Sequence, residues 1–542
     1  METGKQRTYP VILTAAACLF LAVFAKGRSG LMTSLDLAAV FAGLCGVLAW
    51  TATKRILPVI IGAAAGGVIG GAAGFSAVNY DLILTAGGSV LIMICAVYLR
   101  ASGKLDRESQ VFLIFMAGFW IGFCYSQYTD TWLRQNDVGD FMSDKFDPHH
   151  AGYIDYIRHY GWIPNADVRE MDQWYHPPLH HLICAYFMRG YGLVFPSLTR
   201  NYEVLQMLTL GYSFLSSVFM FRIVRMFDIS EKAETTAALF LAFFPIFIIN
   251  AGELNNDILS VMLFVMSIYF IFRWFREGYR LRYIVGSAFA VGLGMMTKLS
   301  VWLAAVPVGI ILLAALIRTR GKEIRIWGQY ILFALISFPL GLWFPVRNLI
   351  GWGVPPTYIP VPLYDKSLEE YSVFQRLFDF IDNSGYYNIP YYAAWSAVFD
   401  DDDYRVHAFW GLLSFVVFAL FAVLAAVAAA GIIYMMIRAL RTKKYVWETS
   451  ALVMLVAAEL ISYTVFCFKF PYPCTMNFRY IIPVTITFVL GFVTLNDRIG
   501  ESANFRTISR LLRGAVVIFA VLSAVFYLTL WAYDLWYAQN IV

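Results

Sequence analysis

The chain has 542 residues, of which 60% are hydrophobic and only 14% are charged, and its mean hydropathy is +0.64. A soluble chain carries roughly a quarter charged residues, so this composition excludes an ordinary soluble enzyme and predicts an integral membrane protein. The formal charge of +5 comes from Lys and Arg residues between apolar segments. It therefore indicates no nucleic-acid partner, and membrane lipids are the expected surroundings.

Apolar segments recur along the chain at about 17–25 residues, the length that a helix needs to cross the hydrocarbon core. They predict an all-α polytopic membrane protein with about 15 transmembrane helices. No A-x-A-like cleavage site follows the first segment, so we interpret it as a retained helix rather than a signal peptide. The expected spans are 10–26, 32–51, 56–77, 81–99, 110–127, 203–221, 235–252, 257–275, 283–297, 299–317, 327–346, 409–437, 446–468, 479–496 and 514–532.

The third expected span is rich in glycine. A phosphate-binding P-loop would need a Lys-Ser or Lys-Thr pair after the glycines, and none follows. Small residues on one helix allow a second helix to approach closely, so we predict tight packing against a neighbouring helix. The glycines are Gly62, Gly66, Gly67, Gly70 and Gly71.

Two long polar segments, 128–202 and 347–408, interrupt the series of spans. Within the first, 178–196 is only moderately apolar, and positive charge decides whether it crosses, because cytoplasmic loops collect Lys and Arg. If 178–196 does not cross, five loops that together carry 19 Lys and Arg residues are cytoplasmic: 222–232, 273–282, 318–325, 438–444 and 498–513. The outer side after residue 202 then carries only seven Lys and Arg residues. We therefore predict a cytoplasmic N-terminus and an outer interfacial or re-entrant segment at 178–196.

In this topology, polar residues with apolar neighbours gather on the outer side. Ionisable groups at a membrane boundary are costly unless they are paired or functional. Carboxylates mixed with His, Lys and Arg suit a site that holds a phosphate and takes a proton from a hydroxyl. These residues are Asn136, Asp137, Asp140, His149, His150, Tyr175, His176, His180, His181, Glu253, Asn255, Asn256, Asp257, Lys298, Arg347, Asn477, Arg479 and Tyr480.

Each of these groups also has a purely structural interpretation. Asp257 would cap the helix that begins there, and Lys298 and Arg479 would extend toward lipid headgroups. The histidines would form hydrogen bonds at the interface, because their spacing fits no metal site on a regular helix. The acidic run at 400–403 would be a solvated loop tip, with divalent-cation binding as the other option.

The seven Cys residues contain no CxxC pair, and five of them lie in apolar runs, so we expect no metal or redox use of these thiols. Cys467 and Cys474 fall near one outer membrane edge. Two free thiols are the expected state there, with a disulfide as the alternative. We predict no cofactor and no metal site, and metal dependence stays open.

These motifs resemble the GT-C glycosyltransferases, in particular the glycosyltransferase family 39-like branch of protein O-mannosyltransferases and lipid A aminoarabinose transferases. The resemblance covers about residues 110–495, and its most distinctive element is the Tyr-His-Pro-Pro-Leu sequence at 175–179. The first-loop acidic motif of the family is often Asp-Glu, whereas Val138 follows Asp137 here, which leaves Asp140 as a second candidate. The other carriers are Asn136-Asp137-Val138, 150–157, 161–164, Asn255-Asn256-Asp257, Thr297-Lys298, Arg347-Asn348 and Phe478-Arg479-Tyr480.

The resemblance implies three parts of the chain. Residues 1–109 would form an N-terminal four-helix membrane module outside the resemblance. Residues 110–496 would form a GT-C-like catalytic core with the outer loops 128–202 and 347–408. Residues 497–542 would supply a cytoplasmic loop and the last transmembrane helix.

The resemblance also implies an inverting hexosyl- or pentosyltransferase at the outer face of the plasma membrane. Its donor would be a polyprenyl-phosphate-linked sugar, and its acceptor a lipid, a glycan or a protein. The general base would be Asp137 or Asp140, and Arg347, Lys298 and Arg479 would bind the donor phosphate. The sugar or acceptor pocket would be formed by His150, Tyr175, His176, Glu253, Asn256 and Asp257.

Two other classes of function fit part of the pattern. A secondary transporter or flippase of an envelope precursor would also have many spans and intramembrane charges, but such proteins typically show inverted repeats and sites near the midplane. A non-catalytic membrane subunit of an envelope assembly would account for the N-terminal four-helix module.

Overall fold

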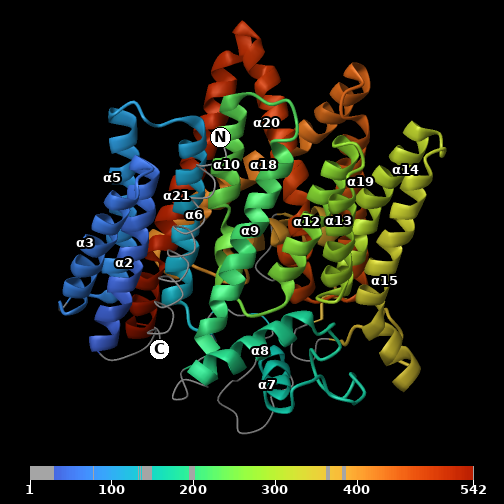
Figure 1. The fold of residues 1–542 in the computed structure, drawn as a ribbon, viewed down its shortest axis with the longest axis horizontal. Coiled ribbons are helices and arrows are strands. Elements are labelled where there is room, and N and C mark those ends of the chain that lie inside the picture. The colour runs from blue at the N-terminus through green and yellow to red at the C-terminus, as the bar shows by residue number, and fades with distance from the viewer. Residues whose placement is uncertain are drawn as a thin grey trace.

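The computed structural model describes residues 30–76, 78–131, 134, 136, 149–194, 202–361, 367–380 and 386–540. Within these ranges the chain is helical and has no strands (Figure 1), which confirms an all-α polytopic architecture. The helical elements are α2 (Gly30–Thr53), α3 (Ile56–Gly74), α4 (Tyr80–Leu82), η1 (Ile83–Gly87), α5 (Gly88–Ala101), α6 (Arg107–Tyr128), α7 (His150–Tyr160), α8 (Leu179–Val194), η3 (Tyr202–Leu205), α9 (Gln206–Val224), α10 (Glu231–Phe243), α11 (Pro245–Gly252), α12 (Asp257–Arg276), α13 (Leu281–Met295), η4 (Leu299–Ala304), α14 (Ala305–Thr319), α15 (Ile324–Trp352), α16 (Val373–Phe378), α17 (Ile389–Phe399), α18 (Ala408–Thr442), α19 (Val446–Lys469), η5 (Pro473–Met476), η6 (Phe478–Val484), α20 (Thr485–Glu501), η7 (Ala503–Phe505) and α21 (Arg506–Asn540).

The described part of the chain contains 13 helices that are long and apolar enough to cross a membrane. Each of them coincides with one of the spans expected from the sequence. The expected span at 283–297 forms the apolar helix α13, which has only 15 residues. The first expected span, 10–26, lies outside the described residues.

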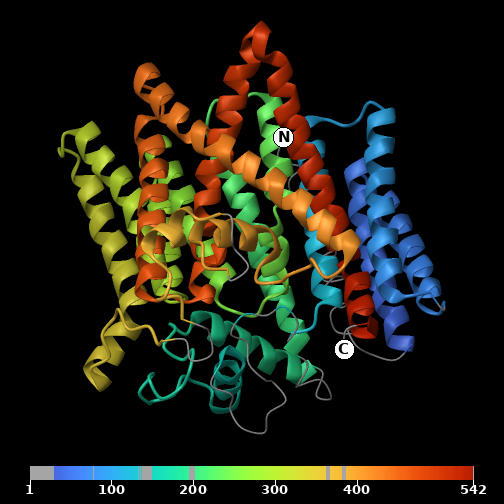
Figure 2. The ribbon, with the colours of Figure 1, turned by 180° about the vertical axis from the view of Figure 1, so that it is seen from behind.

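The spanning helices form one bundle with different structures at its two ends. Helices α7 and α8 lie side by side beyond one end, so α8, the described part of the segment 178–196, does not cross the bundle (Figures 1 and 2). The connections α14–α15, α18–α19 and α20–α21, which carry Lys and Arg, lie at the opposite end (Figure 1). This arrangement places the basic loops and the outer motifs on opposite sides, as the distribution of charge predicts.

The second long polar segment does not form an external loop along its whole length. Its first residues belong to α15, and α17 packs against α11, α18 and η6 inside the bundle (Figure 2). The apolar sequence of α17 accounts for this position, since eight of its residues are buried. The interpretation of residues 400–403 as a solvated loop tip is therefore wrong for Asp400, which follows α17 and is 6% exposed.

The N-terminal helices α2, α3 and α5 pack at one side of the bundle (Figures 1 and 2). The glycines of α3 allow α2 to approach closely, as expected. A Cβ atom on Gly70 would lie 2.3 Å from the carbonyl oxygen of Leu37, and one on Gly66 would lie equally close to that of Phe41. Tight packing of small residues therefore accounts for this glycine-rich segment. The boundary of the module at residue 109 stays a prediction.

We expect Gly70→Ala to lower the melting temperature of the protein in detergent, because the added methyl group forces α2 and α3 apart. Overpacking of this kind costs about 1–3 kcal/mol. Gly67→Ala is the matched control, since its Cβ would lie 3.5 Å from the Cβ of Ala42, an ordinary contact. Both substitutions gain the same helix propensity. Equal melting temperatures for the two variants would contradict the packing argument.

Candidate active site

An ion cluster lies at the start of α12. The Lys298 ammonium forms an ion pair with Asp257, and the Arg479 Nε lies 3.7 Å from the second carboxylate oxygen of Asp257. The side chains of Asp257 and Arg479 are only 6% and 5% exposed, and that of Lys298 is 13% exposed. Lys298 and Arg479 therefore do not extend to lipid headgroups, and Asp257 does more than begin a helix.

Two turns of the chain bring the members of this cluster together. The Asn255 side-chain oxygen accepts a hydrogen bond of 3.0 Å from the backbone N–H of Asp257. The Asn256 amide donates a hydrogen bond of 2.8 Å to the carbonyl oxygen of Thr297, which precedes Lys298. The turn before α12 is thus joined to the turn before η4, and Lys298 itself has an extended backbone there.

Tyr480 covers the two cations. The Lys298 ammonium lies 4.8 Å from the centroid of the Tyr480 ring. The Arg479 guanidinium donates a hydrogen bond of 3.1 Å to the Tyr480 hydroxyl. An aromatic face stabilises a buried cation. The Tyr of the Arg-Tyr motif therefore stabilises Lys298, and its hydroxyl group accepts a hydrogen bond from the neighbouring Arg479.

A second cluster joins two carboxyl groups through amide side chains. The Asn136 amide donates to Glu253 at 3.1 Å and to Asp400 at 2.9 Å. Asn255 donates to the other oxygen of Glu253. Asn477 donates to Asp400 at 2.5 Å, and its side-chain oxygen accepts from the backbone N–H of Arg479 at 2.9 Å. Asn477 therefore connects the carboxyl cluster with the ion cluster.

Both carboxyl groups of this second cluster hold protons more tightly than ordinary side chains. Burial raises the pKa of Glu253 to about 7; the negative charge of Asp257 adds to the rise and the positive charge of Arg479 opposes it. Burial, and then the neighbouring Asp401 and Glu253, raise the pKa of Asp400 well above its usual range. Both carboxyl groups therefore keep their protons to a higher pH than ordinary side chains do, which weakens their ability to neutralise the two cations.

Arg134 anchors the first outer loop to distant parts of the chain. Its side chain is 6% exposed and forms ion pairs with Asp402, at 3.1 Å, and with Asp534 of α21. The Tyr404 hydroxyl donates to Asp402 at 2.8 Å. No local sequence pattern predicts these contacts, because the partners are separated by hundreds of residues.

The histidines form a stacked cluster beside the ion cluster. The rings of His150 and His181 share a hydrogen bond of 2.8 Å, and His150 also stacks on His176 with 5.4 Å between ring centroids. Burial lowers the pKa of each of these rings, and the positive charge of Lys298 lowers those of His150 and His176 further. The rings are therefore neutral. The predicted hydrogen bonding of the histidines is confirmed, since His176 bonds to Gln173 and His180 to the carbonyl oxygen of Leu254, whereas their position at a membrane interface stays a prediction.

Two further candidates, Tyr175 and Arg347, make different contacts. The Tyr175 ring contacts His176, with 4.2 Å between centroids. Arg347 donates to the carbonyl oxygen of Pro164 and lies 4.5 Å from the Trp352 ring, so its contacts join the end of α15 to the first outer loop.

Among the described residues, no group of three or more His, Cys, Asp or Glu side chains is arranged to hold a metal ion.

Both candidates for the general base, Asp137 and Asp140, lie outside the described residues. Their neighbour Asn136 is described, and it contacts Glu253 and Asp400. Cys467 and Cys474 are not joined to each other in a disulfide, as expected.

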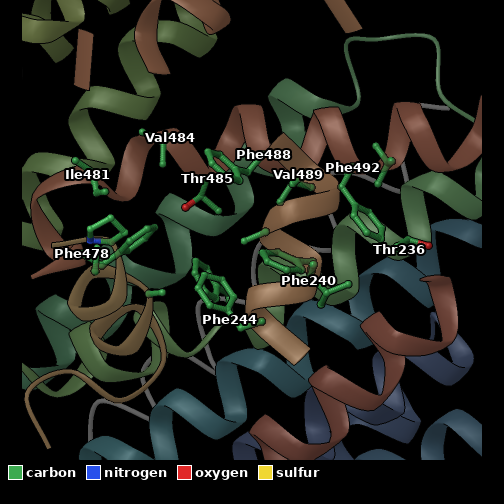
Figure 3. Close-up of a pocket in the computed structure, with 18 residues that line it drawn as sticks. Thr236, Phe240, Phe244, Phe478, Ile481, Val484, Thr485, Phe488, Val489 and Phe492 are labelled. Atoms are coloured by element: carbon green, nitrogen blue, oxygen red, sulfur yellow. The ribbon is translucent and has the colours of Figure 1, made fainter. Parts of the chain in front are cut away.

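An apolar cavity of about 180 Å³ is lined in part by Phe478, the residue before Arg479. Figure 3 shows Phe240, Phe244, Phe478 and Phe488 lining it. Its walls come from α10, α17, α18, η6 and α20. Two consecutive residues of η6 therefore face different surroundings: Phe478 faces the apolar cavity and Arg479 belongs to the ion cluster.

Residues 176–343 match the family model of the dolichyl-phosphate-mannose-protein mannosyltransferases. The matched segment begins at His176, includes Glu253, Asp257 and Lys298, and ends before Arg347. The comparison with curated proteins gave no match. The family match confirms the resemblance predicted from the sequence, and it supports a membrane glycosyltransferase of the GT-C type.

The raised pKa of Glu253 predicts a pH-dependent stability. Between pH 4.5 and about 7 the folded protein keeps the Glu253 proton while the unfolded chain loses it, so this contribution to stability falls as the pH rises. We expect Glu253→Gln to make the fall of the melting temperature with pH shallower across this range. Glu369→Gln, at an exposed position, is expected to keep the wild-type slope. Identical slopes for all three proteins would refute the assignment.

Proposed function

We propose that this protein transfers a sugar from a polyprenyl-phosphate donor to an acceptor hydroxyl, with inversion at the anomeric carbon. The reaction takes place at the bundle end that carries α7 and α8, which we assign to the outer face of the plasma membrane, with the N-terminus in the cytoplasm. One observation carries the proposal: Lys298 and Arg479, from separate parts of the chain, meet at a single carboxylate, Asp257.

Two cations beside one carboxylate leave a local excess of positive charge that favours an anion. Arg479 offers several N–H donors in a plane, and Lys298 offers a compact ammonium. Both stabilise the charge that develops on a departing phosphate. The donor phosphate would replace part of the contact that Asp257 makes with these cations. Arg347, which contacts the first outer loop, would bind at the edge of this site.

The first outer loop supplies the general base. Asn136 contacts Glu253 and Asp400, and this supports a position of the loop beside the ion cluster. Asp137 follows Asn136 in the chain and takes the proton from the acceptor hydroxyl, on the side of the sugar opposite the phosphate. Asp140 is the second candidate. His150, Tyr175, His176, Glu253, Asn256 and Asp257 shape the pocket around the sugar and the acceptor.

The isoprenoid part of the donor needs an apolar surface close to the phosphate site. The apolar cavity lined by Phe478 meets this need, since aromatic and aliphatic side chains form its walls and Arg479 follows Phe478 in the chain. A secondary transporter would instead bind its substrate near the midplane between repeats. The turns that carry the ion cluster contact α8, since His180 hydrogen-bonds to the carbonyl oxygen of Leu254 and the backbone N–H of Leu179 donates to that of Met296. This position beside the helices beyond one end of the bundle favours the transferase.

The general base can be tested by replacing Asp137. We expect Asp137→Asn to lose about 10²–10⁴-fold in turnover, because the amide cannot accept the acceptor proton. Purified protein is incubated with a panel of polyprenyl-phosphate sugars and envelope extract, and the release of free polyprenyl phosphate is measured. Glu170→Gln, an exposed position in the same loop, is the control and is expected to keep activity.

The outcomes of this assay separate the candidates. Retained activity in Asp137→Asn, with loss in Asp140→Asn, would move the role of the base to Asp140. No release from any donor by the wild-type protein in the presence of extract would reject the transferase and favour the transporter or the scaffold.

Filling the apolar cavity should impair long donors more than short ones. Ala425→Phe places a ring in the cavity, so we expect a higher KM for a long polyprenyl-phosphate donor than for a short-chain analogue. Ala426→Phe is the matched control, since Ala426 is exposed on the lipid side of the same helix. An equal rise of KM for both donor lengths would argue against this location of the isoprenoid.

A further inference from the structure

Glu459 is a buried carboxyl group within the membrane-spanning helix α19. Its neighbours in the sequence of that helix are mostly apolar, and the residue is 3% exposed. Among the described residues, the Glu459 carboxyl has no hydrogen-bond partner and no cation within ion-pair distance. The other buried carboxyl of α19, Glu448, differs in this respect because it pairs with Arg276 at 2.7 Å.

Glu459 faces a small cavity that it shares with the ion cluster. The walls of this cavity include Asp257, Lys298, Arg479, Tyr480 and Ser260. Its volume is about 20 Å³, which suits one water molecule or one oxygen atom of a larger group. The two cations and the carboxyl group of Glu459 therefore line the same small cavity.

The physical state of this carboxyl follows from its surroundings. Burying an isolated carboxylate costs so much free energy that such a group takes up a proton instead. Lys298 and Arg479 face the same cavity but are held by Asp257, and neither forms an ion pair with Glu459. Burial therefore favours a neutral carboxylic acid at Glu459, whose O–H group has no acceptor among the described residues.

We propose that Glu459 is a donor-binding residue that gives a hydrogen bond to one phosphate oxygen of the polyprenyl-phosphate group. This inference rests on the proposed function and deepens it. The phosphate oxygen occupies the water-sized space, while Lys298 and Arg479 hold the other oxygens. A neutral acid adds a hydrogen bond without adding negative charge, which an ionised carboxylate beside a phosphate would do.

The test compares Glu459→Leu, which removes the hydrogen-bond donor, with Glu459→Gln, whose amide keeps one. A hydrogen bond to a charged group contributes about 1.5–3 kcal/mol, so Leu should raise the donor KM by about 10- to 100-fold, with a smaller effect on kcat. Gln should stay within about threefold of wild type. Leu also removes an unpaired polar group from the bundle, so the melting temperature should not fall.

Glu448→Gln is the matched control on the same helix. It breaks an ion pair in the first turn of α19, away from the cavity, so it should lower the melting temperature and leave the donor KM unchanged. A purely structural role for Glu459 would give the same result as this control, with loss of stability and no change in KM.

A binding measurement separates the phosphate from the sugar. Polyprenyl phosphate without a sugar is titrated into the wild-type protein and the Glu459→Leu variant, and binding is followed by the thermal shift. Weaker binding to the variant supports the proposal. Equal binding to both proteins overturns it, even where Glu459→Leu impairs transfer through a contact with the sugar. Failure of the wild-type protein to bind polyprenyl phosphate or to transfer sugar would overturn the proposed function as well.

Discussion

The burial of Asp257 with Lys298 and Arg479 is the interaction on which the rest of the site depends. Moving an ion into an apolar interior costs several kcal/mol, and removing one partner of a buried pair typically costs about 3–5 kcal/mol. The start of α12, the entry to η4 and the segment η6 must therefore keep fixed relative positions. Among the described residues, one carboxylate faces two cations, and this excess of positive charge is the basis of the proposed phosphate site.

The irregular parts of the backbone lie where the site requires them. Pro245 separates α10 from α11, Lys298 is extended before η4, and Arg479 lies in a 3-10 segment before α20. Irregular backbone at membrane depth is tolerated only where protein or water satisfies its polar groups. Asn256 and Asn477 supply such partners, since their side chains bond to backbone atoms of the neighbouring turns. The same side chains thus satisfy the backbone and position the cations.

Much of the fold could be predicted from the sequence, because long apolar segments and the distribution of Lys and Arg depend on local composition. The grouping of Asp257, Lys298 and Arg479 was accessible through the family resemblance. Asp400 was not, because an acidic run has the local pattern of a solvated loop, and only distant partners such as Asn136 and Asn477 bury it. Glu459 gave no signal either, since one carboxyl in an apolar run does not change the prediction of a span.

The two halves of the site are held by one hydrogen-bonded chain. Asn136 has two amide N–H groups and uses them on two different carboxyl groups, Glu253 and Asp400. Asp400 continues to Asn477, whose oxygen holds the backbone of Arg479. A carboxylate in place of Asn136 would remove these donors and place another acid beside Glu253 and Asp400, so the amide suits this position where the acid of the same shape would not. Asn136 of the first outer loop and the backbone of Arg479 are therefore linked through Asp400 and Asn477, although they lie hundreds of residues apart in the sequence.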